Sequence, residues 1–169
     1  MNYALAIASA ILLALIHPGA DLTFLAPFAL APLLFACARE PRWKRRFLAG
    51  WAAGVVYWWA VCYWIQFVLE VHGGMGRFGS WGTFALFSLA KGLHMAVFAT
   101  LVGWLMSRWW ALPAVAALWA GLERTHGPLG FAWLELGNAG VDMAIPLRVA
   151  PVVNIYGLSF VFAMTAAAV

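Results

Sequence analysis

Lys91 is the residue of this sequence whose position most strongly suggests chemistry. It lies in the middle of a long apolar stretch, and Ser88 and His94 are each three residues away, so all three share one face of a helix. A charged group at the centre of an apolar membrane helix costs about 2.5 to 3.5 kcal/mol, so it is expected to be functional or paired and to face the protein interior. A buried polar site built on Lys91 and His94 is one hypothesis. A purely structural hydrogen bond, or a lysine stem that reaches toward water, is the other.

A second set of polar side chains occupies residues 123–148, where charge, Gly and Pro interrupt an otherwise apolar sequence. Arg124 and Arg148 are candidates for holding a phospholipid head group, because Arg offers planar, bidentate recognition of phosphate. Glu123 and Glu135 are two further polar candidates in this segment. The carboxylates in this segment do not have a spacing that identifies a catalytic pair, and no nucleophile with a positioned base is visible. The residues thus predict a surface for lipid or a partner and no reaction.

His72 is followed by two glycines, and it is the last candidate. The sequence His72-Gly73-Gly74 is either a hinge beside a site or an ordinary exposed turn, since Gly pairs commonly mark loops. Cys37 and Cys62 both fall in apolar runs without metal-ligand spacing and are interpreted as packing residues. No metal and no cofactor is predicted.

The composition decides which elements must hold these residues. Of 169 residues, 66% are apolar and only 9% are charged, far from the roughly half apolar and about a quarter charged of soluble domains. Several segments approach the roughly 20 apolar residues needed to cross a bilayer. Continuous apolar runs favour helices over the alternating pattern of a membrane barrel. We therefore predict an all-α, polytopic membrane protein.

The prediction comprises one membrane domain, residues 1–169, with about six transmembrane helices. Pro27 and Pro32 are expected to bend the second helix. Gly50 and Gly54 form a small-xxx-small pair on the third, which predicts close approach of another helix. Residues 123–148 are expected to form a polar periplasmic segment. The predicted helices lie near residues 3–16, 22–38, 47–71, 80–106, 110–122 and 149–169.

The distribution of basic residues predicts the orientation. Five of the ten Lys and Arg residues lie between residues 39 and 46, and this cluster is interpreted as a cytoplasmic anchor, not as a nucleic-acid site. Arg108 marks a second cytoplasmic turn, so both termini are expected to be cytoplasmic and the loop at His72 to face outward. The sequence ends inside an apolar run at Val169 without a following charge. It is therefore expected to be a fragment or a truncated product.

Several motifs carry a family resemblance that covers nearly the whole chain. They are HPGADLTFLAP, RRFLAGWAAGVVYW, YWIQFVLEVHGGM, GPLGFAWLELGN and PLRVAPVVNIYGLSF. In this order they resemble the N-terminal membrane domain of apolipoprotein N-acyltransferase. The most specific parts are the loop at His72 and the segments 131–138 and 155–160.

The resemblance implies a protein of the bacterial inner membrane that moves an acyl chain from a phospholipid to the N-terminal amine of a lipoprotein's diacylated cysteine. It also implies that a Glu, Lys and Cys triad in a periplasmic nitrilase-like domain performs the chemistry. No residue of this chain matches that triad, so no catalytic residue is predicted. Phospholipid and the membrane are the expected partners, with the apolipoprotein substrate reached through the missing catalytic domain. The resemblance makes the polar candidates of the periplasmic side candidates for supporting that domain or lipid entry, namely His72, Glu123, Arg124, Glu135 and Arg148. This chain alone is expected to be inactive.

Two other functions remain open from the sequence. One is a small transporter or channel-like protein that uses Lys91 and His94 as a buried polar site. The other is a non-catalytic membrane anchor that recruits a separate nitrilase-like partner.

Overall fold

The protein is helical in every regular element that the structure describes. The computed structural model covers residues 2–128 and 133–169, so part of the motif GPLGFAWLELGN lies outside the described residues. No strand occurs in the described ranges, which confirms the all-α fold class. The helices are α1 (Tyr3–Leu15), η1 (Thr23–Phe28), α2 (Ala31–Arg39), α3 (Trp43–Cys62), α4 (Trp64–Val71), α5 (Arg77–Leu105), α6 (Ala111–Arg124), η2 (Leu136–Asp142) and α7 (Ala144–Ala168), η denoting a 3-10 helix.

The contact between α3 and α5 is the most extensive in the fold, and glycines make it possible. A methyl group added at Gly54 would lie 2.7 Å from the carbonyl oxygen of Gly92, and one at Gly50 would lie 2.5 Å from that of Met95. Such distances leave no room for a side chain, so the two backbones are in direct contact. The predicted close approach at Gly50 and Gly54 is confirmed.

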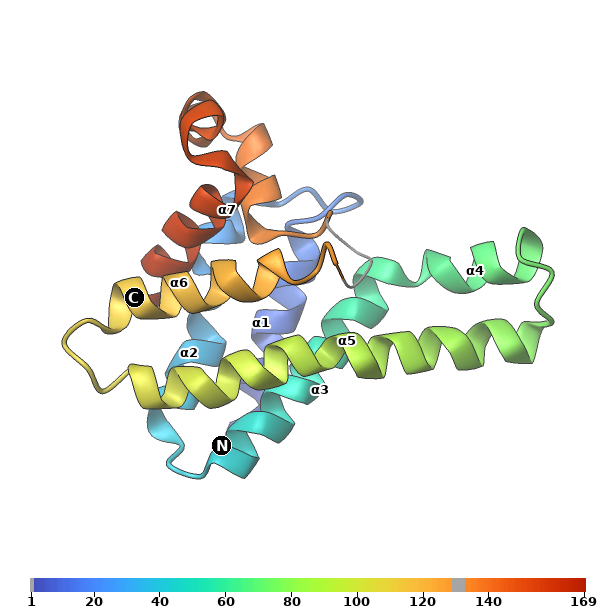
Figure 1. Ribbon diagram of the computed structural model, residues 1–169, viewed down its shortest axis with the longest axis horizontal. Helices are drawn as coiled ribbons and strands as arrows, with labels where there is room; N and C mark the ends of the chain where they lie inside the picture. The colour runs from blue at the N-terminus through green and yellow to red at the C-terminus, as the bar shows by residue number, and fades with distance from the viewer. Residues whose placement is uncertain (1, 129–132) are drawn as a thin grey trace.

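Two stretches predicted as single helices are divided. Residues 22–38 form η1 and α2, because Pro27 lies inside the first and Pro32 at the start of the second, and Pro donates no backbone hydrogen bond. Residues 47–71 form α3 and α4, whose axes differ in direction by 55°. No Pro or Gly marks this second break. At the bend the chain leaves α1 and pairs with the first half of α5, so that α4 and α5 project as an arm (Figure 1).

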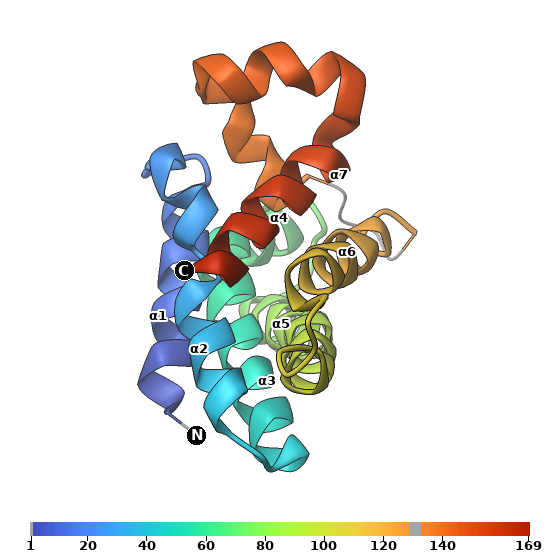
Figure 2. The same ribbon diagram turned by 90° about the vertical axis from the view of Figure 1, so that its left-hand side faces the viewer.

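The last helix begins earlier than the predicted residue 149 and is also kinked. It starts at Ala144 and contains Pro151, and Asn154 has a φ of 63°, outside the helical region. Ahead of the kink the helix is largely exposed, with Val152 at 86%. Beyond the kink it packs against α6 and η2 (Figure 2). The predicted polar segment therefore contains η2 and the first turns of α7.

Fewer than the predicted six helices of the described residues are long and apolar enough to cross a membrane. In the described part of the chain, α5 and α7 are each long and apolar enough to cross a membrane, and the bent pair α3 and α4 makes a possible third. The remaining helices fall below the roughly 20 residues that a crossing needs, since α1 has 13, α2 has 9 and α6 has 14. The count of about six is thus not confirmed.

Candidate functional site

Glu123 joins the end of α6 to η2. Its Oε1 atom accepts hydrogen bonds from the Trp119 ring N–H at 2.8 Å and from the Leu136 backbone N–H at 2.7 Å. The side chain is only 2% exposed. Trp119 lies one helical turn before Glu123 on the same face of α6, so the helix itself positions one of the two donors. The carboxylate thereby holds the first residue of η2 against α6.

Glu135 precedes η2 and is also buried, at 1% exposed. Its Oε2 atom accepts a hydrogen bond from the Asn138 side-chain N–H at 3.0 Å, and the same amide nitrogen donates to the Trp133 carbonyl at 2.6 Å. Burial raises the pKa of Glu135, and the Asn138 hydrogen bond and the positive charge of Lys91 lower it by less. Glu135 therefore lies close to Lys91 of α5.

Lys91 faces the protein interior and is 5% exposed. Its ammonium nitrogen lies 4.7 Å from the centre of the Trp58 ring of α3, which places the charge over an aromatic face. Ser88, one turn earlier, is completely buried. The interior position fits the expectation for a charged side chain at the middle of an apolar helix.

His94 and His126 lie edge to face, with ring centroids 4.6 Å apart. His126 also contacts Trp58, at 5.5 Å between centroids. The His94 Nε2 atom lies 3.0 Å from the Thr125 hydroxyl, at the end of α6. Burial, and to a lesser extent the charges of Lys91 and His94, lower the pKa of His126 to about 3. His126 is thus neutral at physiological pH.

His17 and Tyr57 connect the end of α1 to the segment before η2. Burial lowers the pKa of His17 to about 4, so its ring is neutral. The Tyr57 hydroxyl lies 2.8 Å from His17 Nε2 and donates to the Leu134 carbonyl at 3.2 Å. Because the hydroxyl has one proton, the arrangement that satisfies all three groups has His17 Nε2–H donating to the Tyr57 oxygen.

These side chains form one group, which we call the buried polar cluster. Several of them line a single narrow pocket between α1, α3, α5 and α6. The structure brings together four residues singled out from the sequence, Lys91, His94, Glu123 and Glu135. It buries the side chains of both glutamates inside the protein. The buried polar cluster comprises His17, Tyr57, Lys91, His94, Glu123, His126 and Glu135.

The other three candidates lie on the surface. His72 is exposed, and its ring contacts Phe67 at 6.2 Å between centroids. Arg124 is exposed, with its guanidinium 5.3 Å from the centre of the Tyr156 ring. Arg148 is exposed on the first part of α7. The structure does not bring these three into the buried polar cluster.

Sequence reasoning did not select His17, Tyr57 and His126 as site residues. Tyr57 is one of many aromatic residues in α3, and His17 belongs to a Pro-Gly turn. The available signal was their polarity within an apolar chain, since buried polar groups need partners. Polarity alone does not predict which of these side chains contact one another.

A groove opens beside the buried polar cluster, between the end of α1, the α3–α4 bend and residues 133–134. Its volume is about 500 Å³. His17 and Leu134 belong to both the groove and the narrow pocket of the cluster, so the two adjoin. Small or aromatic side chains form much of its wall, which suits an extended apolar ligand. The groove is lined by Ala14, His17, Pro18, Ala60, Val61, Tyr63, Trp64, Trp133 and Leu134.

The side chains of the buried polar cluster can hold protons, and the adjoining groove can bind an apolar ligand. Cys37 and Cys62 are both 0% exposed, in agreement with their interpretation as packing residues. Among residues 2–128 and 133–169, no group of three or more His, Cys, Asp or Glu side chains is arranged to hold a metal ion.

Comparison with known proteins identifies the family. A family model described as the apolipoprotein N-acyltransferase N-terminal domain matches residues 9–168. Apolipoprotein N-acyltransferase of Geobacter metallireducens is 34% identical over 167 residues, which cover 96% of this chain and 32% of the relative. The enzyme of the same name from Nitrosomonas europaea is 33% identical over 147 residues, covering 82% of this chain and 28% of the relative.

The chain thus spans about a third of the length of the curated relatives it matches. Its match to the family model runs through nearly all of its helices, from α1 to α7. The helical fold, the apolar composition and the extent of this match lead to one conclusion: the chain belongs to the family of apolipoprotein N-acyltransferase N-terminal domains.

Proposed function

We propose that this chain is the membrane-domain portion of an apolipoprotein N-acyltransferase of the bacterial inner membrane. The complete enzyme would transfer an acyl chain from a phospholipid to the N-terminal diacylated cysteine of a lipoprotein. The observation that carries the proposal is the family match over residues 9–168. With the six crossings expected from the sequence, both termini of the chain would lie on the cytoplasmic side together with the basic segment 39–46.

The groove beside the buried polar cluster would receive an acyl chain of the phospholipid. It adjoins His17 and Leu134, which the Tyr57 hydroxyl links. Its volume of about 500 Å³ lies within the roughly 300 to 1,000 Å³ typical of ligand pockets. Glu123 and Glu135 would support the groove indirectly, because they hold the segment that carries Leu134.

The exposed candidates would act at the membrane surface. Arg124 and Arg148 carry guanidinium groups suited to phosphate, and they would hold lipid head groups. His72 lies at the tip of the arm formed by α4 and α5 and would border the remainder of the enzyme. None of these residues would take part in the covalent chemistry, which the family places in a separate domain.

The test is to exchange domains. Residues 1–169 would replace the matching segment of the Geobacter metallireducens relative, and the purified enzyme would be assayed with labelled phospholipid and a diacylated lipopeptide. We expect the exchanged enzyme to transfer the acyl chain and the isolated chain to form no acyl adduct. A hydroxylamine-sensitive adduct on the isolated chain, or an inserted and folded but inactive exchanged enzyme, would contradict the proposal.

The groove is tested in the same exchanged enzyme. Ala60→Trp fills the groove and should raise KM for phospholipid, because the acyl chain loses its space. Val56→Trp is the matched control, since Val56 is exposed one turn earlier on α3 and does not line the groove. Equal effects of the two substitutions would refute binding in the groove.

A further inference from the structure

The net positive charge of the chain is concentrated between α2 and α3. The chain has ten basic and six acidic residues, a net charge of +4. Residues 39–46 contain five of the basic residues and one acid, Glu40, which leaves +4. The rest of the chain then has five basic and five acidic residues and no net charge. The whole electrostatic bias of the protein is therefore located at one short connection.

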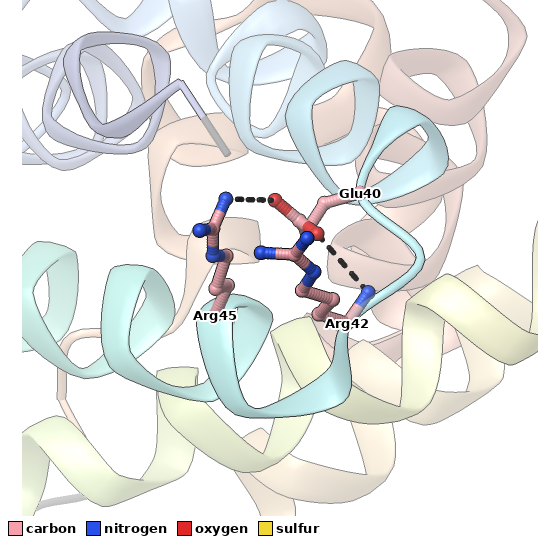
Figure 3. Close-up of polar contacts among 3 residues, drawn as sticks. All are labelled: Glu40, Arg42 and Arg45. Atoms are coloured by element: carbon pink, nitrogen blue, oxygen red, sulfur yellow. Dashed lines mark hydrogen bonds and ion pairs between the residues drawn. The ribbon is translucent and has the colours of Figure 1, made fainter.

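The single carboxylate of this connection is turned inward. Glu40 is only 6% exposed and accepts a hydrogen bond from the Arg42 backbone N–H at 3.1 Å. Its other oxygen lies 3.8 Å from a guanidinium nitrogen of Arg45, whose side chain is 50% exposed (Figure 3). Within the described residues, Arg39, Arg42 and Lys44 have no carboxylate within 4.0 Å. These three side chains are exposed, and no carboxylate of the described residues neutralises their charges.

Aromatic rings lie beneath these charges. The guanidinium of Arg39 is 4.0 Å from the centre of the Phe35 ring, and the ammonium of Lys44 is 5.8 Å from that of Trp43. Trp43 is 51% exposed. Aromatic side chains next to Lys and Arg are typical of the level at which head groups meet the acyl chains of a bilayer.

A buried arginine lies at the base of the same connection. Arg46 is 3% exposed and packs against Gly103 near the end of α5, with its guanidinium 6.0 Å from the Trp104 ring centre. In the described part of the chain its Nε–H has no hydrogen-bond acceptor. An acceptor that is not part of the described protein would complete this group, and an anionic oxygen has the matching charge.

We propose that Arg39, Arg42, Lys44 and Arg45, which we call the basic surface, bind the head groups of anionic phospholipids. The occupant follows from charge complementarity, from the exposed guanidinium groups that match phosphate, and from the flanking aromatic rings. The basic surface is separate from the groove. The proposed binding of head groups does not depend on acyl transfer or on the side of the membrane that this surface faces. It ties the junction of α2, α3 and the end of α5 to the bilayer surface.

The test measures binding of a dilute fluorescent phosphatidylglycerol to the purified chain in neutral micelles, with the same label on phosphatidylcholine as reference. We expect the native chain to prefer phosphatidylglycerol. The variant R42Q/K44Q/R45Q should bind it at least about tenfold more weakly, since each basic group near an anionic surface contributes a factor of roughly five. The charge-preserving variant R42K/R45K should retain the preference, which separates loss of charge from misfolding.

A matched variant removes the same charge elsewhere. Arg77 is also exposed and begins α5, at the opposite end of that helix from Gly103 and Arg46. R77Q should leave the preference unchanged, whereas the single variant R42Q should weaken it. The proposal is overturned if R42Q/K44Q/R45Q keeps the preference or if R77Q weakens it as much as R42Q does. It is also overturned if inorganic phosphate, at matched ionic strength, binds the native chain as tightly as the lipid does, which would indicate a site for free anions only.

Discussion

At the scale of single residues, Glu123 has the clearest consequence for stability. One of its oxygens accepts two hydrogen bonds, from Trp119 and from the backbone of Leu136, in a buried setting. Glu123→Ala removes the acceptor and leaves one buried and one partly buried donor, so the free energy of unfolding should fall by about 2 to 3 kcal/mol. Reversible unfolding in mixed detergent micelles measures this change.

Glu123→Gln is the matched variant, because the amide keeps one acceptor oxygen at the same distance along the side chain. It should lose less stability than Glu123→Ala. Equal losses would mean that the hydrogen bonds to Glu123 are not what holds η2.

His126 gives the protein a predictable dependence on pH. Burial lowers its pKa from 6.5 to about 3, so the folded state stays neutral while the unfolded chain binds a proton as pH falls below 6.5. Stability is therefore full above about pH 7 and is lost as pH falls toward 3. At pH 5 the loss from this one group is about 2 kcal/mol. His17, with a pKa of about 4, acts in the same direction.

The contribution of His126 can be isolated by substitution. Glu135 has a raised pKa and acts in the opposite direction, but its effect is common to the native chain and to His126→Phe. Between pH 7 and pH 5 the free energy of unfolding of the native chain should fall by about 2 kcal/mol more than that of His126→Phe. A difference that stays constant over this range would contradict a neutral, buried His126.

The candidate site could be predicted only in part, because some of its residues carry a local signal in the sequence and others do not. Lys91 and His94 were selected because a charge in an apolar helix is unusual in itself. Glu123 and Glu135 were selected as polar residues of a predicted periplasmic segment, and the structure buries both side chains. The backbone donor to Glu123 comes from Leu136, beyond the end of α6, and no local pattern reveals that pairing.

At the scale of elements, the contact between α3 and α5 depends on the absence of side chains. The Cβ atom introduced by Gly54→Ala would lie 2.7 Å from a backbone oxygen and 2.8 Å from the Cα atom of Gly92, and neither can move without shifting α5. We expect a loss of about 1 to 3 kcal/mol in unfolding free energy, the usual cost of overpacking. Unfolding in micelles provides the measurement.

Gly121→Ala is the control for this substitution. A methyl group at Gly121 in α6 would meet no atom within 4 Å, and Ala favours the helix by up to about 1 kcal/mol. The control should therefore be neutral or stabilising. If Gly54→Ala is equally harmless, the two helices are not in backbone contact.

The elements themselves were predictable where the sequence carries a local signal. Pro27 and Pro32 indicated the division between η1 and α2, and Gly50 and Gly54 indicated the close helix contact. The bend between α3 and α4 has no Pro or Gly to indicate it. It arises where α4 leaves α1 to pair with α5, which is a tertiary contact.

At the scale of the whole molecule, the large apolar side chains on the surface indicate the environment of the protein. Phe78 and Leu86 of α5 are 96% and 68% exposed, and Val152 of α7 is 86% exposed. The buried polar cluster lies inside the protein, whereas charged side chains such as Arg42 and Arg45 are exposed at the connections between helices. Large apolar side chains exposed on the candidate membrane spans α5 and α7 suit a lipid environment.

This arrangement predicts that the free energy of membrane insertion lost by introducing a charge depends on its position along α5. Leu86 lies nine residues, roughly 13 Å, beyond the first residue of the helix, whereas Phe78 is the second residue and follows Arg77. Leu86→Arg should therefore cost about 2.5 to 3.5 kcal/mol in membrane insertion and Phe78→Arg less than about 1 kcal/mol. Both side chains are exposed, so neither substitution disturbs internal packing. The fraction of chains with α5 inserted, measured by glycosylation mapping, gives the apparent free energies, and equal costs at the two positions would place Leu86 outside the lipid.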